Sequence, residues 1–383
     1  MSSQICNDKL PQGWEIVRLG EVCDVRDGTH DSPKYTDFGI PLVTSKNIVN
    51  GNLDLTEISY ITQSDADKIN ERSKVDINDI LMSMIGTIGS AILVNKTPNF
   101  CIKNVALFKP NHSKISAVFL VQLIQSKIFK NALNASLDGG IQKFISLLNL
   151  RNFKISIPKD IAVQDRIAQV LGDFDELISA KIELIDKKRA IKEATAQQLL
   201  TPKPHWHATI LGEIVEIFDN LRIPIAASLR KFGTTPYYGA NGIQDYVDGF
   251  THNGEFVLIA EDGANDLINY PVCYVNGKIW VNNHAHVVSG KNKIVDNKFL
   301  SYCLKMTNFS KFLVGGTRAK LNGSIFKKIE ISIPNHTEQI KISQILSDMD
   351  DEISALQDEV EKLKMIKQSV MSELLSGKIR LKG

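Results

Sequence analysis

The sequence predicts an α+β protein in which two similar mixed α/β domains are separated by two long helices that pair as an antiparallel coiled coil. Ile-Ser-Ile-Pro occurs at 155–158 and again at 331–334, and a long, uninterrupted helical pattern follows each copy. About a third of the positions are identical when 166–200 is aligned with 341–375, a period of about 175 residues. A period this long indicates a duplicated module rather than a solenoid. We therefore expect an internal pseudo-twofold repeat.

The repeat also suggests where the domains begin and end. A Trp followed shortly by Leu-Gly-Glu stands at Trp14 and again at Trp206. Pro158 and Pro334 precede the two helical patterns, and Pro202 follows the first, as helix-breaking residues should. The expected segments are a first domain at 1–157, a central helix at 158–203, a second domain at 204–333 and a C-terminal helix at 334–383.

Both domains are expected to be mixed α/β folds dominated by strands. Short apolar runs broken by Gly, Asn and Asp fill each of them. Asn276-Gly277 lies between two β-rich runs and predicts a hairpin turn. One helical stretch is expected in each domain, at 116–133 and at 297–313. A Gly pair follows each stretch, ahead of the Ile-Ser-Ile-Pro segment.

The two long helices show a heptad pattern. In the second copy, apolar residues recur in steps of three and four over about four heptads, and only Lys367 interrupts them. Thirty-five residues would form a rod of about 50 Å. The cheapest partner for each stripe is the other copy, although two independent amphipathic helices, each packed on its own domain, are the alternative. The residues predicted to pair the helices are Leu171, Phe174, Ile178, Ile185, Leu346, Met349, Ile353, Leu356, Val360 and Leu363.

Composition excludes several classes of protein. The sequence contains no run of about 18 apolar residues, so no membrane span is expected. The N-terminus lacks the pattern of a secretory signal. The five cysteines are scattered without a CxxC pair, which favours reduced thiols in the cytoplasm and no structural zinc site. The net charge is only +2, so any DNA-binding surface must be local.

We find no pattern typical of catalysis or of a metal site. Gly86-Thr87-Ile88-Gly89 lacks the spacing of a phosphate loop and is interpreted as a turn. His284 and His286 share one face of a predicted strand, but no third ligand stands nearby in the sequence, so core or surface histidines are the preferred interpretation. Glu261-Asp262-Gly263 is interpreted as a turn rather than a nuclease motif. We therefore predict no catalytic residue and no metal ligand.

Polar loops are the candidates for contact with nucleic acid. The Gly pairs allow close approach of backbone to phosphate, and basic residues follow them. Other candidate loops lie at 27–39, 44–47, 221–233 and 235–242, where tyrosines stand among basic residues. Gln142 suits adenine and Arg318 suits guanine, and ordinary exposed loop residues are the alternative for these segments. The candidate DNA-binding residues are Thr29, His30, Lys34, Tyr35, Lys46, Gln142, Lys143, Arg222, Lys231, Tyr237, Tyr238, Arg318 and Lys320.

Taken together, these residues resemble the DNA-specificity (S) subunit family of type I restriction–modification systems. The resemblance covers nearly the whole chain. It rests on the Trp…Leu-Gly-Glu starts, the repeated helix and the Gly-Gly-to-Ile-Ser-Ile-Pro segments, together with DGTH…PKY…GIP at 27–41 and PYYGANG at 236–242. FISLLNL at 144–150 departs from the polar stretch of the family, which NGSIFKK at 322–328 keeps.

The resemblance implies a non-catalytic subunit of a restriction system that performs DNA methylation. Each domain would be a target recognition domain for one half of a bipartite, asymmetric site on double-stranded DNA. The helices would set the distance between the domains and dock two methylation (M) subunits. Restriction (R) subunits would join the assembly. No cofactor is implied for this chain, because S-adenosylmethionine and ATP with Mg²⁺ would be bound by the partners.

Two other classes of function remain open from the residues alone. The first is a stand-alone nuclease or methyltransferase with motifs that the sequence does not reveal. The second is a protein-binding adaptor whose heptads drive homodimerisation, since heptads can pair between chains as well as within one. A homodimer of the isolated chain is also compatible with the first interpretation.

Overall fold

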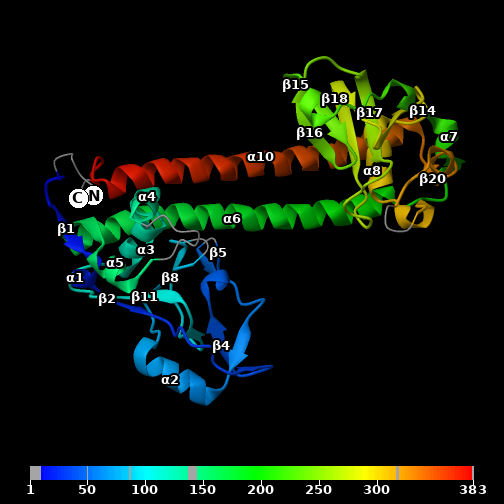
Figure 1. The fold of residues 1–383 in the computed structure, drawn as a ribbon. Helices are drawn as coiled ribbons and strands as arrows, with labels where there is room; N and C mark the ends of the chain where they lie inside the picture. Colours follow the sequence, from blue (N-terminus) through cyan, green and yellow to red (C-terminus); the bar gives the residue numbers. More distant parts are fainter. Residues whose placement is uncertain (1–9, 50, 86–87, 137–144, 316–318, 382–383) are drawn as a thin grey trace. The chain divides into compact units, whose positions relative to one another are not determined.

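The chain divides into two compact units, each of which contains one half of both long helices. The computed structural model describes residues 10–49, 51–85, 88–136, 145–315 and 319–381. Unit 1 comprises residues 1–181 and 359–383, and unit 2 comprises residues 182–358. The long helices are α6 (Ile161–Leu200) and α10 (His336–Leu375), drawn in green and red in Figure 1. Helices and strands are mixed in both units, so the predicted α+β class is confirmed.

Unit 1 packs two small sheets against each other and one of them against helices. Alternate residues of the central strand point to opposite faces. Ala106 and Phe108 join the core beneath the helix α3, whereas Val105 and Leu107 face the second sheet. The first sheet has the order β2-β11-β8-β9 (Cys23–Asp27, Val105–Pro110, Ile80–Ser83, Ala91–Leu93), and the second has the order β10-β4-β7-β3 (Cys101–Ile102, Ile40–Val43, Ser59–Ile61, Tyr35–Thr36).

Short elements complete unit 1. The helices are α1 (Leu19–Val22), α2 (Gln63–Ser73), α3 (Ala117–Gln125), α4 (Lys127–Ala135) and α5 (Leu147–Asn152), and the 3-10 turn η1 covers Ser45–Asn47. Two two-stranded ladders pair β1 (Trp14–Arg18) with β12 (Lys154–Pro158) and β5 (Ile48–Val49) with β6 (Asn52–Leu53).

Unit 2 is built on one six-stranded sheet. Val257 and Ile259 pack toward the helix α8, and Phe256 and Leu258 fill the core on the other face. Figure 1 shows α8 lying against β17 and β18. The strand order is β14-β19-β17-β18-β15-β16 (Val215–Ile217, Ala285–Gly290, His252–Ala260, Val272–Val281, Phe232–Gly239, Gly242–Val247). The remaining elements are α7 (Leu211–Ile214), α8 (Asn297–Lys305), α9 (Gly323–Phe326), the ladder of β13 (His207–Ile210) with β20 (Glu330–Ile333), and the 3-10 turns η2 (Asp219–Leu221), η3 (Ala227–Leu229) and η4 (Phe309–Phe312).

The Leu-Gly-Glu segment plays the same role in both units. Its glycine lies so close to a neighbouring backbone that a side chain would barely fit. A Cβ atom on Gly20 would stand 3.1 Å from the carbonyl oxygen of Arg151, and one on Gly212 would stand 3.0 Å from that of Lys327. The close approach joins the start of each domain to the short helix that precedes its Ile-Ser-Ile-Pro strand.

A buried glutamine in each long helix fastens that helix to its own unit. Gln164 accepts a hydrogen bond of 2.8 Å from the backbone N–H of Ser116 and donates one of 2.7 Å to the carbonyl of Pro158. Gln339 makes the matching pair with Asp296 (2.9 Å) and Pro334 (2.9 Å). Neither glutamine has any solvent-exposed surface, so both side chains would be costly to leave unpaired.

In unit 1, the first half of α6 lies antiparallel to the last part of α10. Lys367, which interrupts the apolar heptads, donates to both oxygens of Asp175 at 2.6 Å and is only 14% exposed. Gln122 of α3 donates to the same carboxylate at 3.1 Å. Lys181 pairs with Glu359 further along at 2.7 Å. The residue numbers run in opposite directions along the two helices, which confirms the predicted antiparallel pairing within this unit.

Unit 2 repeats this arrangement with the roles of the helices exchanged. Lys192 of α6 pairs with Asp350 of α10, and Tyr302 of α8 donates to the same carboxylate at 2.7 Å. Lys188 pairs with Glu352 at 2.6 Å. A charged pair inside an apolar seam is satisfied in only one register, so it specifies how the helices align.

The structure corrects two local expectations from the sequence. Asn276-Gly277 is no hairpin turn but the middle of β18, where Gly277 (φ +103°) faces Gly254 (φ +148°) of β17. Paired glycines absorb the unusual backbone angles of both strands without reversing the chain. The helical stretch at 116–133 is two helices, because Ser126 ends α3 and caps α4 through a 3.1 Å bond from Phe129 N–H.

We predict that Asp175→Ala destabilises unit 1 by about 1–2 kcal/mol, because it leaves the largely buried Lys367 ammonium without its carboxylate. The double substitution Asp175→Leu with Lys367→Met should recover most of this loss. Lys364→Ala is the matched control, because its exposed pair with Glu361 should contribute under about 0.5 kcal/mol. Urea unfolding measures all three, and an Asp175→Ala effect no larger than the control would contradict the role of the pair.

Candidate nucleic-acid interface

In unit 1 the described candidate DNA-binding residues lie between the end of β2 and the start of β3, except Lys46, which lies in η1. Thr29 is half-buried, whereas His30, Lys34, Tyr35 and Lys46 are exposed. Gln142 and Lys143, and Arg318 in unit 2, lie outside the described residues. The four exposed side chains keep the access to a duplex that their predicted role requires.

Lys103, which the sequence did not single out, belongs to the same surface. Its ammonium lies 2.9 Å from the hydroxyl of Ser32 and 3.4 Å from that of Tyr35. Thr29 and Lys103 also form an isolated backbone bridge. The lysine therefore ties the loop at 27–39 to the turn before β11. No local motif marks Lys103, since it meets this loop only through tertiary pairing.

A cavity of about 460 Å³ opens beside this loop. Thr29 and His30 of the loop and Lys68 and Arg72 of α2 are among the residues that line it. Asp31 and Asp65 also contribute, so the lining carries both signs of charge. Lys68 and Arg72 are four residues apart and share one face of α2. This face was not predicted from the sequence, because α2 carries acidic residues as well.

A buried aspartate supports the loop from beneath. Asp27 ends β2 with 4% of its surface exposed and pairs with His30 (2.7 Å) and Arg72. The other ring nitrogen of His30 lies 2.8 Å from the amide oxygen of Asn104. The hydrogen bonds to Asp27 and Asn104 raise the pKa of His30 above its ordinary value, because both ring nitrogens face oxygen acceptors.

In unit 2 the structure removes three candidates from an accessible loop. The segment at 235–242 was expected to be a loop, but most of it belongs to β15, which turns into β16 at Ala240-Asn241. Tyr237 is 1% exposed, and its hydroxyl accepts from the backbone N–H of Ile225 at 3.0 Å. Tyr238 is buried in the sheet core. Sequence reasoning missed the strand β15, in which both rings are buried.

Arg222 is the third candidate that lies inward. Its guanidinium bonds the carboxylate of Glu261 at 2.7 Å and the carbonyl of Ala285 at 2.8 Å, with 14% of the side chain exposed. These partners make it a structural residue rather than a free phosphate contact. Lys231 is exposed, and Lys320 is half-exposed with its ammonium 2.9 Å from Glu261.

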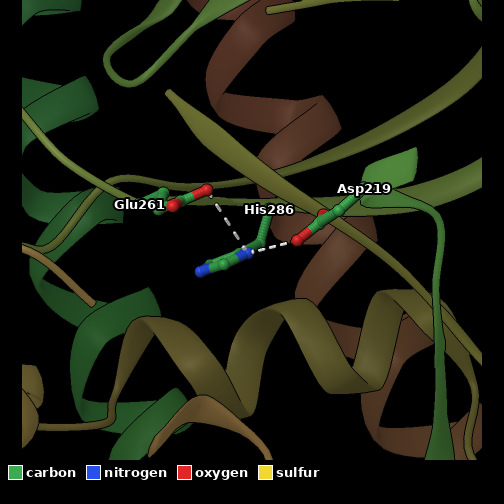
Figure 2. Close-up of side chains that lie close together, drawn as sticks. All are labelled: Asp219, Glu261 and His286. Atoms are coloured by element: carbon green, nitrogen blue, oxygen red, sulfur yellow. Dashed lines mark hydrogen bonds and ion pairs between the residues drawn. The ribbon is translucent and has the colours of Figure 1, made fainter. Parts of the chain in front are cut away.

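Asp219, Glu261 and His286 converge in unit 2 where β17 ends and β19 begins. Figure 2 shows one ring nitrogen of His286 facing both carboxylates, at 2.6 Å from Asp219 and 3.8 Å from Glu261. The other nitrogen lies 2.8 Å from the carbonyl oxygen of Leu321. Burial opposes a charged ring, but the hydrogen bonds to Asp219 and Leu321 outweigh it and raise the pKa of His286.

These three residues have ligand atoms close enough to hold a metal ion, all within 4.8 Å of one another. Their surroundings do not fit one. Arg222 and Lys320 already neutralise Glu261, and they hold its pKa below the ordinary value against the effect of burial. His286 faces an oxygen with each ring nitrogen, so protonation, not coordination, satisfies it. The proximity of Asp219 and Glu261 to the histidines was not visible in the sequence.

The ten residues predicted to pair the helices are all at least partly shielded from solvent. None of the ten is exposed. Leu171, Ile185, Leu346, Ile353 and Val360 are buried, and the other five are half-buried. Leu171 belongs to the core of unit 1 and Leu346 to the core of unit 2. The coil is thus continuous with the domain core in each unit.

Two regions of the chain, 11–187 and 205–365, match the family model described as type I restriction modification DNA specificity domain. The chain belongs to this family. A putative type I restriction enzyme specificity subunit of Haemophilus influenzae is 52% identical over 136 residues, which are 36% of this chain and 35% of that relative. The putative MjaX specificity subunit of Methanocaldococcus jannaschii is 25% identical over 98% of this chain and 95% of its own length.

Solved structures share the fold. The S subunit of a type I restriction–modification system from M. genitalium has a TM-score of 0.63 at 16% identity and covers 98% of this chain and 99% of its own. A chain from a structure titled for complex assembly and conformational transition of the type I R-M system has a TM-score of 0.58 at 18% identity, over 97% and 100%. The family shown by the family model is the one that the sequence was found to resemble.

None of the helices in the described part of the chain has the length and apolar content needed to span a membrane.

We predict that this specificity-family chain loses stability in unit 2 as the pH rises. The pKa of His286 is raised on folding, so its stabilising contribution is complete below the unfolded pKa of about 6.5 and is lost as pH rises through the folded pKa. Melting temperatures between pH 6 and pH 9 should fall more steeply for the wild type than for His286→Asn. The exposed His112 provides the control, as His112→Asn should leave the slope unchanged.

Proposed function

We propose that the chain is a specificity subunit of a type I restriction–modification system, in which each unit recognises one half of a bipartite, asymmetric site on double-stranded DNA. The observation that carries this proposal is a duplicated framework that bears two different surfaces. The Leu-Gly-Glu contacts, the glutamine clamps and the charged helix pairs recur in both units. The segments between them differ, with two four-stranded sheets in unit 1 and one six-stranded sheet in unit 2.

Different surfaces on equal frameworks suit two different half-sites. The contacts that recur in both units attach each domain to the long helices in the same way. The loops carry the residues that would recognise the DNA sequence. The exposed candidates of unit 1 lie between β2 and β3, at the start of β3 and in η1. Those of unit 2 are Lys231, directly before β15, and the half-exposed Lys320, shortly before α9. A palindromic site would require equal reading surfaces, so we expect the half-sites to differ.

We further propose that this chain has no catalytic role of its own. Methyl transfer would take place on methylation subunits that bind S-adenosylmethionine, and ATP with Mg²⁺ would be bound by restriction subunits. Support comes from the titratable cluster at Asp219, whose groups are already paired with one another and with Arg222 and Lys320.

The helices are the proposed docking site for two methylation subunits. Leu184 and Ile191 lie seven residues apart on one face of α6 within unit 2 and are 40% and 55% exposed. A row of exposed apolar side chains at this spacing is what a second helical protein packs against. We predict that Leu184→Asp with Ile191→Asp abolishes stable assembly with methylation subunits, measured by light scattering, without lowering the melting temperature of the chain. Lys187→Ala on the same helix is the control.

The same exposed row supports one alternative, a homodimeric protein-binding adaptor. In that case the chain alone would dimerise through α6, and duplex DNA would not alter its mass. Light scattering of the purified chain, with and without duplex DNA and methylation subunits, separates the two. A second chain bound at high affinity in place of methylation subunits would contradict the specificity role.

We also predict that the two long helices set the spacer between the half-sites. Inserting a heptad into α6 after Lys181 and another into α10 before Glu359 preserves the seam and adds about 10 Å to each helix. Since duplex DNA rises about 3.4 Å per base pair, the preferred spacer should lengthen by about three base pairs while both half-sites stay the same. The sequences selected from randomised duplexes measure this. An unchanged spacer in a folded insertion variant would contradict the proposal.

Exchange of one unit tests the division of labour directly. Replacing 205–331 with the corresponding segment of a relative should change one half-site and leave the other unaltered. Replacing 10–155 should change the other half alone. A change in both halves from either replacement would exclude independent recognition by the two units.

A further inference from the structure

The two units carry an aspartate at the same place in their frameworks. When Leu19-Gly20-Glu21 is aligned with Leu211-Gly212-Glu213, Asp27 falls opposite Asp219 without a gap. Asp27 ends β2, and Asp219 stands two residues after β14. The sheets agree with this alignment, since β2 pairs antiparallel with β11, which leads to α3, and β14 pairs antiparallel with β19, which leads to α8. The equivalence is therefore structural as well as sequential.

Each aspartate holds one histidine and one arginine. Asp27 pairs with His30 at 2.7 Å and with Arg72. Asp219 pairs with His286 at 2.6 Å and with Arg222 at 3.5 Å. The third residue after the aspartate is a histidine in unit 1 and an arginine in unit 2. The same chemistry thus persists although the residues that supply it have changed, which points to a retained role.

In unit 2 this cluster joins four segments that are remote in the sequence. Arg222 and Lys320 both bond Glu261, at 2.7 and 2.9 Å. His286 donates to the carbonyl of Leu321 at 2.8 Å, and Leu321 N–H donates to the carbonyl of Glu261 at 2.7 Å. Lys320 is a candidate DNA contact. The cluster consequently fixes Lys320 and Leu321 to the end of the sheet.

In unit 1 the cluster fixes a different loop in the same manner. His30 reaches from Asp27 to Asn104, whose backbone takes a left-handed turn (φ 53°). Asn104 N–H donates to the carbonyl of Thr29 at 3.2 Å. Arg72 brings in the end of α2, which lines the cavity beside Thr29 and His30. The loop that carries the candidates of unit 1 is thereby held from below.

Direct contact with DNA explains these residues less well. Asp27 is 4% exposed, and a carboxylate would repel phosphate. Arg222 is 14% exposed and has four oxygen partners. A metal site fails on the same cations, which already neutralise the carboxylates.

We propose that Asp27 and Asp219 are positioning residues. Through their histidine and arginine partners, they hold the loop at 27–39 in unit 1 and Lys320 in unit 2 in place for contact with DNA. This inference rests on the proposed function. Loss of either aspartate should impair one half-site only, because each cluster lies wholly within one unit.

The test selects short duplexes of randomised sequence with the full chain assembled with its methylation subunits. Asp219→Ala should lower enrichment at one half-site at least about tenfold, the size of a lost base contact, and leave the other half-site intact. Asp27→Ala should lower enrichment at the other half-site and leave the first one intact. Glu216→Ala and Glu71→Ala, which remove exposed carboxylates beside each cluster, should change neither half.

A conservative variant separates positioning from a general need for charge. In Asp219→Asn, the amide oxygen can still accept from Val287 N–H, and the amide N–H can donate to a neutral His286, whose other nitrogen keeps its bond to Leu321. Enrichment should therefore stay within about threefold of wild type. A loss equal to that of Asp219→Ala would overturn the positioning role.

Hydrogen exchange in β17 and β19 shows whether unit 2 stays folded in Asp219→Ala. If it does not, Glu261→Gln decides, because it keeps the shape of the side chain but releases Lys320, and an unchanged half-site would overturn the inference. If wild type enriches both halves and Asp219→Ala also keeps both, this inference alone fails. If wild type enriches no bipartite sequence, the proposed function fails, and the inference fails with it.

Discussion

The antiparallel contact between the halves of α6 and α10 is the constraint on which both units depend. In each unit an apolar seam is interrupted by one aspartate–lysine pair, Asp175 with Lys367 or Asp350 with Lys192. A domain side chain, Gln122 in unit 1 and Tyr302 in unit 2, donates to the same aspartate. The same group therefore fixes both the register of the helices and the position of the domain on them. An apolar seam alone would tolerate slippage by a heptad, whereas a paired charge does not.

Once the domain is fastened to its helices, its outer segments are free to diverge. The glutamine clamps and the Leu-Gly-Glu contacts use backbone groups and residues that both copies retain. The segments between these contacts do not attach the domain to its helices, and they fold as different sheets in the two units. The aspartate clusters stand at the border between these two regions. They transmit the rigidity of the framework to the loops that it carries, which suits a protein that discriminates sequences by geometry.

The sequence predicted the parts of this architecture that follow from periodicity and repetition. Heptads identify the helices, and the repeated segments identify the two domains. Tertiary pairing decided what the sequence left open. Tyr237 was expected on a loop, yet it lies in β15 and is 1% exposed. Arg222 reads as a phosphate contact, yet Glu261, 39 residues away, engages it. The aspartates could have been found by extending the alignment of the two domain starts to Asp27 and Asp219.

Long-read mapping of modified bases in cells that produce this chain with its methylation subunits tests the central claim most directly. Two scaffolds with different surfaces predict two short, dissimilar half-sites separated by an undefined spacer of one fixed length. A single contiguous motif, two identical half-sites or a spacer of variable length would contradict the account.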